Sequence, residues 1–212
     1  MQSTEVCGSG AVFANGAVTA AFARIFGEAA SSGGMLGDSD ASGNVRDPAV
    51  SRAASAAANE ALGDSLTTTY GSLDAASAVW SDAVQPVADQ FDTEIASKFF
   101  QVRGGYRFGR AYSDGIICSK SVQCAVSWRS GGDVRGSLVG YIHTHPSNRM
   151  GPFSGGDLYQ AWSASDEGRS PFSAYVSLPN RQIWSWSSVD YMRSRAAYSS
   201  WDQANNLARR VR

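Results

Sequence analysis

The chain contains only two histidines, and they lie two residues apart, as His143 and His145. They end a run of strand-forming residues, and residues i and i+2 of a strand point to the same face of a sheet, about 6–7 Å apart along the chain. Pro146 comes next, and because proline has no N–H group to donate, strand pairing should end there. Two imidazoles at the end of a strand can bind one metal ion together.

Asp157 is the candidate for a third ligand. It lies three residues after Ser154, in the first turn of a helix that we expect from Ser154 to about Asp166, where the helix dipole favours a carboxylate. Two histidines, one aspartate and an open position for water are the composition of a catalytic zinc site. Zinc lowers the pKa of that water towards neutrality, which makes the water a nucleophile at physiological pH.

Such a site also needs a general base that lies near the water but not on the metal. The chain offers five glutamates: Glu5, Glu28, Glu60, Glu94 and Glu167. Glu94 is the best placed of these, because it lies at the junction of an expected helix and an expected strand. We therefore expect Glu94 to act as the base.

Together these residues resemble the motif of the JAB/MPN (JAMM) zinc metallopeptidases. In that family a glutamate is followed, some fifty residues later, by His-x-His-Pro, a loop and Ser-x-x-Asp. This chain has Glu94, His143-Thr-His145-Pro146 and Ser154-Gly-Gly-Asp157. The resemblance covers roughly residues 80–190, and three stretches also resemble the toxin-associated branch of the family: residues 94–100, 140–146 and 178–184.

The resemblance implies that His143, His145 and Asp157 bind Zn2+, and that Glu94 takes a proton from the water and passes it to the leaving amine. It also implies that Ser154 stabilises the oxyanion of the tetrahedral intermediate. The family has seven residues between the second histidine and the serine, whereas this chain has eight, a difference that a surface loop absorbs easily. A helix-capping box would account for Ser154 and Asp157 equally well.

The elements around these residues predict an α+β fold (α/β-like) in which helices flank a mixed β-sheet. The resemblance implies a JAB/MPN-like, cytidine-deaminase-like architecture. Expected helices cover residues 17–30, 49–62, 73–85, 154–166 and 188–211, with Pro86 ending the third. Expected strands cover residues 98–101, 106–112, 116–118, 125–128, 137–145, 172–178 and 182–186, the last two as a hairpin.

Residues 1–70 form an Ala/Gly/Ser-rich segment, which we expect to be a partly helical, partly flexible extension before a metallohydrolase domain over residues 71–212. Residues 8–28 resemble the segment that precedes the C-terminal toxin in Rhs-type bacterial polymorphic toxins. That resemblance implies that the chain is the C-terminal part of a larger secreted protein. Such a toxin is delivered into a target cell, for example by type VI secretion, and is neutralised by a cognate immunity protein.

The leading hypothesis is a toxin that acts as a zinc peptidase or isopeptidase on a target-cell protein or a peptidoglycan stem peptide. A catalytically inactive MPN-like binding module and a metal-dependent nuclease toxin remain as alternatives. The net charge of −1 argues against a nucleic-acid partner, and no apolar stretch is long enough to predict a membrane span. Cys118 and Cys124 could form a disulfide or remain ordinary buried thiols.

Overall fold

The computed structural model describes residues 38–39, 43–121, 123–127, 134–146, 152–194 and 198–212. The chain divides into two compact units, Met1–Gly34 and Met35–Arg212, and every described residue belongs to the second. The helix expected over residues 17–30 and the toxin-like stretch over residues 8–28 lie outside the described residues. The division by contacts falls between Gly34 and Met35, and the expected boundary between residues 70 and 71 stays a prediction.

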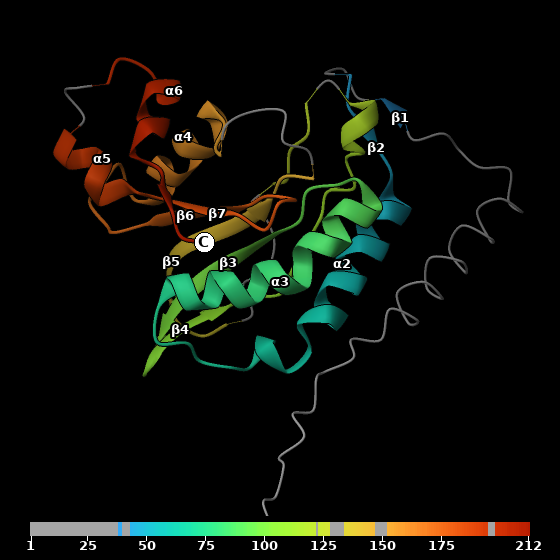
Figure 1. The fold of residues 1–212 in the computed structure, drawn as a ribbon, viewed down its shortest axis with the longest axis horizontal. Helices are drawn as coiled ribbons and strands as arrows, with labels where there is room; N and C mark the ends of the chain where they lie inside the picture. Colours follow the sequence, from blue (N-terminus) through green and yellow to red (C-terminus); the bar gives the residue numbers. More distant parts are fainter. Residues whose placement is uncertain (1–37, 40–42, 122, 128–133, 147–151, 195–197) are drawn as a thin grey trace, which may run out of the picture. The chain divides into compact units, whose positions relative to one another are not determined.

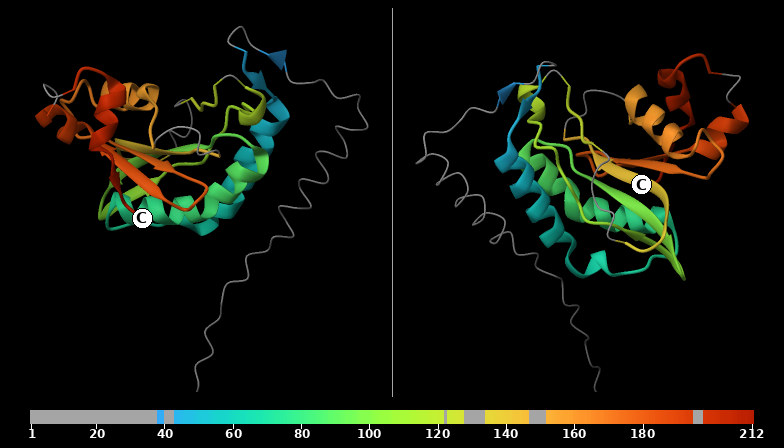
Figure 2. Two further views of the ribbon diagram at one scale, coloured as in Figure 1. Left: turned by 45° about the horizontal axis from the view of Figure 1, so that its top comes forward. Right: turned by 180° about the vertical axis from the view of Figure 1, so that it is seen from behind.

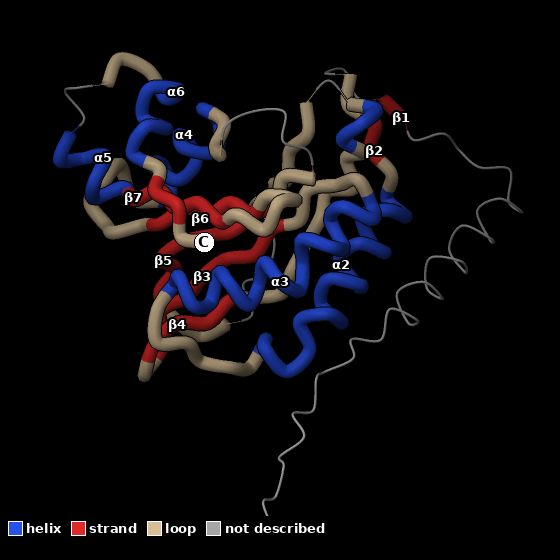
Figure 3. The backbone as a smooth tube through the Cα atoms, in the orientation of Figure 1, coloured by secondary structure: helices blue, strands red, loops and turns tan. Residues whose placement is uncertain are grey.

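A six-stranded mixed sheet organises the second unit (Figures 1 and 3). Its strands lie in the order β4 (Gly105–Phe108), β3 (Ala96–Val102), β5 (Ser137–Thr144), β6 (Ser173–Ser177), β7 (Ile183–Ser187) and β8 (Arg209–Arg210). Neighbouring strands are antiparallel except β5 and β6, which are parallel. The expected α+β class with a mixed sheet is therefore confirmed.

Two long helices cover one face of this sheet. Helix α3 (Leu73–Phe91) packs on the sheet, and α2 (Pro48–Leu62) packs against α3. Both helices begin at a side chain that accepts backbone N–H groups, Asp47 for α2 and Ser72 for α3. Along α3, Ala76, Trp80, Val84 and Ala88 are buried at helical spacing, so its apolar stripe faces the strands.

The opposite face carries the C-terminal helices α4 (Gly155–Ala164), α5 (Ser188–Ser194) and α6 (Trp201–Ala204) (Figure 2). A second cluster of buried side chains packs between these helices and the sheet, and it includes Leu158, Trp162 and Val176. Successive side chains of β6 point to opposite faces of the sheet. Val176 belongs to this cluster, whereas Ser177 contacts Ser81 of α3 on the other face. Shorter elements are β1 (Asp38–Ser39), β2 (Val45–Arg46), and the 3-10 turns Gly63–Leu66, Cys118–Lys120 and Asn205–Leu207.

Two expected helices are wrong. Helix α3 continues through Pro86 to Phe91. Proline removes one helical N–H group and crowds one carbonyl, and the burial of Val84, Val87 and Ala88 on the sheet offsets that cost. The long helix expected over residues 188–211 is instead α5, α6 and the edge strand β8, because the chain returns to pair with β7.

The strands expected over residues 116–118 and 125–128 are also absent from the described part of the chain. Ile116 forms an isolated bridge to Arg46, and Cys118 begins a 3-10 turn. Further along, the backbone N–H groups donate to side chains rather than to a strand: that of Gln123 to Asn44, and that of Ser127 to Asp114. Side-chain acceptors therefore replace the strand ladder that periodicity predicted.

Candidate metal centre

His143 lies in the central strand β5, and its backbone is paired on both sides, with Ala96 of β3 and Val176 of β6. The side chain is 1% exposed and points to the face covered by α4. His145 follows directly after the strand, and its backbone N–H donates to the Ser177 carbonyl at 2.9 Å. The sheet thus fixes both imidazoles at the end of one strand, as the spacing predicted.

Asp157 is held at the start of α4 by a capping box with Ser154. The Ser154 hydroxyl accepts the Asp157 N–H at 3.2 Å, and the Ser154 N–H donates to Asp157 Oδ2 at 2.8 Å. The same hydroxyl also donates to Asp157 Oδ2 at 2.8 Å, and the Tyr141 hydroxyl donates to the Asp157 carbonyl at 3.3 Å. Buried Leu158 anchors this first turn in the core, so the carboxylate has a defined position.

His143, His145 and Asp157 converge into one buried group whose ligand atoms all lie within 4.8 Å of one another. The two Nε2 atoms are 3.1 Å apart, and Asp157 Oδ2 lies 3.6 Å from the first and 3.9 Å from the second. Two ligands at about 2.0–2.1 Å from a tetrahedral zinc are about 3.3 Å apart. Both the distances and the nitrogen and oxygen donors fit a divalent metal, and no metal identity follows from them alone.

Glu94 joins this group from a third segment, between the end of α3 and the start of β3. Asp92 ends the helix in a left-handed conformation, and the chain then turns into the sheet. The Glu94 side chain is buried, and its Oε1 lies 3.8 Å from His145 Nε2. The predicted base therefore lies beside the group formed by the three predicted ligands, next to His145.

Burial and the neighbouring charges set the ionisation of the group in the absence of a metal. Burial raises the pKa of Glu94 to about 8, against the opposing charge of His143. Burial also lowers the pKa of His145 to about 4. Burial would raise the pKa of Asp157 as well, but the two histidines and the Ser154 backbone hold that pKa far below its usual range. A neutral imidazole and an ionised carboxylate are the forms that bind metals.

The negative charge of Asp157 raises the pKa of His143. Burial lowers the pKa of this histidine, but the charge of Asp157, its hydrogen bond and the charge of Glu94 together raise it above the usual value. A divalent ion would replace the proton that these carboxylates attract. The aromatic ring of Tyr141 stacks on that of His143, with centroids 5.4 Å apart, and restrains its orientation.

The sequence did not predict the contacts that support the site from the α3 face of the sheet. Thr144 faces away from the metal ligands and bonds to Ile95, and Gln85 of α3 donates to the His145 carbonyl at 3.2 Å. The alternation along β5 could have placed Thr144 on the α3 face. The contact of Gln85 had no local signal, because the residue lies 60 positions from its partner.

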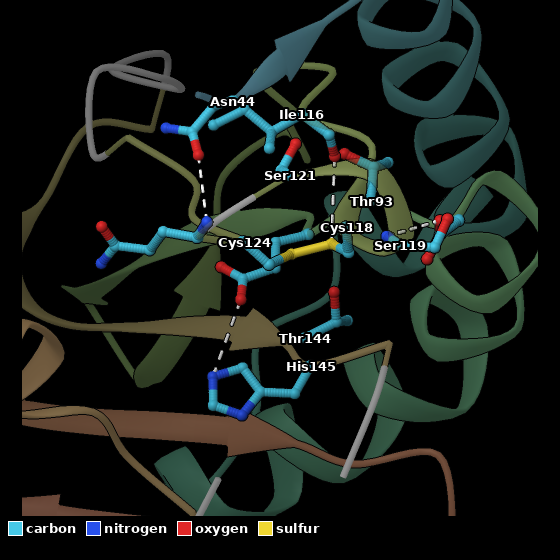
Figure 4. Close-up of a disulfide and its surroundings, with 12 residues drawn as sticks. Asn44, Thr93, Ile116, Cys118, Ser119, Ser121, Cys124, Thr144 and His145 are labelled. Carbon is cyan, nitrogen blue, oxygen red and sulfur yellow. Dashed lines mark hydrogen bonds and ion pairs between the residues drawn. A yellow bond between two sulfur atoms is a disulfide. The ribbon is translucent and has the colours of Figure 1, made fainter. Parts of the chain in front are cut away.

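A disulfide joins Cys118 to Cys124, with Cα atoms 4.7 Å apart, which settles the alternative left open by the sequence. Its surroundings include Thr93, Thr144 and His145 (Figure 4). The segment is also tied to the end of α3, since the Cys118 N–H donates to the Asp92 carbonyl at 2.8 Å. The disulfide therefore belongs to the scaffold around the candidate metal centre.

Comparisons with protein-family models, with curated proteins and with solved structures found no match to this chain. No helix in the described part of the chain is long and apolar enough to cross a membrane.

Proposed function

We propose that this chain is a zinc-dependent peptidase or isopeptidase of the JAB/MPN (JAMM) kind, with the corresponding fold. The observation that carries the proposal is the convergence of His143, His145 and Asp157, with Glu94 3.8 Å from one imidazole. These residues come from separate segments, and chance rarely buries two imidazoles and two carboxylates together, because each buried charge is costly without a partner. The order and types of the residues are those of the family motif.

Bound zinc would lower the pKa of a water molecule and polarise the carbonyl of the scissile amide. Glu94 would take the proton from the attacking water and deliver it to the leaving nitrogen. Burial beside His145 keeps bulk water away from the carboxylate.

Ser154 would donate a hydrogen bond from its hydroxyl to the developing oxyanion. In the structure this hydroxyl donates to Asp157 Oδ2, which also accepts the Ser154 N–H. The carboxylate therefore keeps one hydrogen bond when the hydroxyl turns towards a substrate. Capping of α4 and stabilisation of the oxyanion are compatible roles for one serine.

The biological setting of the proposal is a secreted bacterial toxin, delivered into a target cell as the C-terminal part of an Rhs-type protein and restrained by an immunity protein. The support is the resemblance of residues 8–28 to the segment before such toxins. A disulfide near the site is compatible with an oxidising destination, such as the periplasm of the target cell.

The test is expression in bacteria, in the cytoplasm and in the periplasm, of the wild type, Glu94→Gln and the matched control Glu60→Gln. Glu60 is an exposed residue of α2, so its substitution removes the same charge far from the metal centre. We expect the wild type and Glu60→Gln to kill in one compartment and Glu94→Gln to be harmless. Newly formed amino termini in the proteins and cell wall of dying cells would identify the cleaved bond. Equal toxicity of Glu94→Gln, or cleavage of DNA or RNA instead, would refute the proposal.

A further inference from the structure

A disulfide closes a short loop beside the candidate metal centre. It joins Cys118 to Cys124, six positions apart in the chain, and Figure 4 shows Thr93, Thr144 and His145 around it. The Cys118 side chain is buried, whereas Cys124 is partly exposed. A thiol in solution therefore reaches the disulfide from the side of Cys124.

This loop holds the end of helix α3. The Cys118 N–H donates to the Asp92 carbonyl at 2.8 Å, and the Ser119 N–H donates to Asp92 Oδ2 at 2.9 Å. Asp92 ends the helix with a φ of 50°, in a left-handed conformation that aspartate adopts less readily than glycine does. The two hydrogen bonds from the loop stabilise Asp92 in that conformation, two residues before Glu94.

Glu94 is held differently on its two sides. The following residue, Ile95, is fixed to the end of β5 by two hydrogen bonds. On the other side, the Thr93 hydroxyl bonds to that of Ser113 at 2.9 Å, and Asp92 is bonded to the disulfide loop. Release of Asp92 would therefore loosen the turn before Glu94 without unpairing the sheet after it.

The loop has few buried contacts of its own. Among the described residues from 118 to 124, only the side chain of Cys118 is buried. Two single hydrogen bonds tie the loop to the chain around β2: the Val45 N–H donates to Ser121 Oγ at 2.9 Å, and the Gln123 N–H donates to Asn44 Oδ1 at 3.1 Å. Segments with so little apolar burial open easily, so the covalent bond is the main constraint on this loop.

We propose that the Cys118–Cys124 disulfide is a redox switch for the candidate metal centre, and that its reduction by a dithiol releases Asp92 and lets Glu94 leave its position beside His145. One thiolate of the dithiol attacks Cys124 Sγ, the S–S bond breaks, and Cys118 leaves as a thiolate that takes up a proton. The second thiol of the dithiol then displaces Cys124 from the mixed disulfide. The dithiol ends as a disulfide, and both cysteines end as thiols.

The consequence for activity rests on the proposed function. Zinc would stay bound, because its three candidate ligands, His143, His145 and Asp157, lie outside the loop. Proton transfer would fail, because it requires Glu94 in one defined position. The enzyme would then be active in an oxidising compartment and inactive in a reducing cytoplasm, including that of the cell that makes it.

The first test follows amide hydrogen exchange in the full chain with a chelator present, so that neither zinc nor hydrolysis enters the result. The protein carries Cys7→Ser, which leaves the two disulfide cysteines as its only cysteines. Exchange is compared before and after reduction with dithiothreitol. The amide of Ser119 reports on the loop, that of Thr93 on the turn before Glu94, and that of Phe172, just before β6, on the rest of the sheet.

We expect reduction to accelerate exchange about tenfold at both Ser119 and Thr93, as for the loss of one hydrogen bond, and to leave Phe172 unchanged. Cys118→Ala/Cys124→Ala should exchange like the reduced protein and should not respond to dithiothreitol. Three outcomes would overturn the proposal: no acceleration, acceleration at Ser119 without Thr93, which limits the disulfide to its own loop, and acceleration at Phe172, which makes it a brace of the whole fold.

The second test compares Cys118→Ala/Cys124→Ala with Cys7→Ser for zinc content and for toxicity in the periplasm and in the cytoplasm. We expect both proteins to hold stoichiometric zinc and only Cys7→Ser to kill, from the periplasm. Killing by both, or killing by Cys7→Ser only in the reducing cytoplasm, would overturn the switch. If neither protein kills although Thr93 responds to reduction, the redox response stands and the proposed function fails.

Discussion

Thr144 and Ile95 exchange two hydrogen bonds: the Thr144 N–H donates to the Ile95 carbonyl, and the Ile95 N–H donates to Thr144 Oγ1, each at 3.0 Å. Both residues are fully buried. Thr144 lies between the two histidines, and Ile95 directly follows Glu94. This pair therefore sets the position of the proposed base relative to the metal ligands, from the side of the sheet that faces α3.

The first prediction concerns this pair. Thr144→Val keeps the shape of the side chain but leaves the buried Ile95 N–H without an acceptor, so we expect a loss of about 1–3 kcal/mol in unfolding free energy. Zinc content should stay stoichiometric while toxicity falls, because Glu94 loses its anchor. Denaturant unfolding and elemental analysis provide the measurements. Thr144→Ser retains the hydroxyl and should behave as the wild type; if it is as impaired as Thr144→Val, the hydroxyl is not the cause.

The second prediction is about metal binding. His143→Ala, His145→Ala and Asp157→Ala each remove one ligand, and we expect each to abolish stoichiometric zinc, whereas Glu94→Gln should keep it. Zinc should raise the melting temperature of the wild type, since an ion that binds only the folded state stabilises it, and it should not raise that of the ligand variants. A purified wild type that binds no zinc after reconstitution would contradict the whole arrangement.

The third prediction follows from the raised pKa of Glu94. The pKa is 4.5 for an ordinary glutamate and about 8 here, so between these values the folded state binds the extra proton. Folding stability of the chelated protein must then fall as pH rises through that window, by about 5 kcal/mol in total. Glu94→Gln cannot ionise and should lack this contribution. Its unfolding free energy should exceed that of the wild type at pH 8 and match it near pH 4.5.

Chelation is essential to that comparison, because a bound metal changes the ionisation of every group around it. Urea unfolding of both proteins with a chelator, at several pH values, gives the difference directly, and effects of the titrating groups that do not interact with Glu94 cancel. A difference that does not grow with pH would show that Glu94 is not desolvated in the folded protein.

The fourth prediction separates the two roles of Ser154. Ser154→Ala and Ser72→Ala each remove the N-cap of a helix, at α4 and at α3, and each should cost about 1 kcal/mol of stability. Only Ser154→Ala should also abolish toxicity, because Ser72 lies at the start of α3, away from the metal ligands. If the two variants lose equal stability and both remain toxic, Ser154 acts as a cap alone.

Local patterns predicted the elements that carry the site. Each sequence signal lies within a few residues: the alternation before His143, the proline after His145 and the capping box at Ser154. The turn signal of the hairpin between β6 and β7 is equally local. The physical reason is that each signal concerns neighbouring backbone hydrogen bonds. The mixed sheet followed from the same signals.

Elements that depend on distant contacts could not be predicted in this way. Continuation of α3 past Pro86 depends on burial against the sheet, and β8 forms because the chain returns to the free edge of β7. Arg209 of β8 also binds Asp74 of α3 with both carboxylate oxygens at 2.9 Å. None of these partners is near in sequence, so propensity alone gave the wrong element.

The candidate metal ligands and Glu94 come from three stretches of the chain: Glu94 precedes β3, His143 and His145 lie at the end of β5, and Asp157 lies at the start of α4. An unfolded copy of this chain therefore contains no assembled centre, only scattered weak ligands. A chain that is threaded through a secretion apparatus in extended form would arrive inert and without metal. Under the proposed function, it would become active only after refolding and acquiring an ion from its new surroundings, and the zinc supply at the destination would limit the onset of that activity.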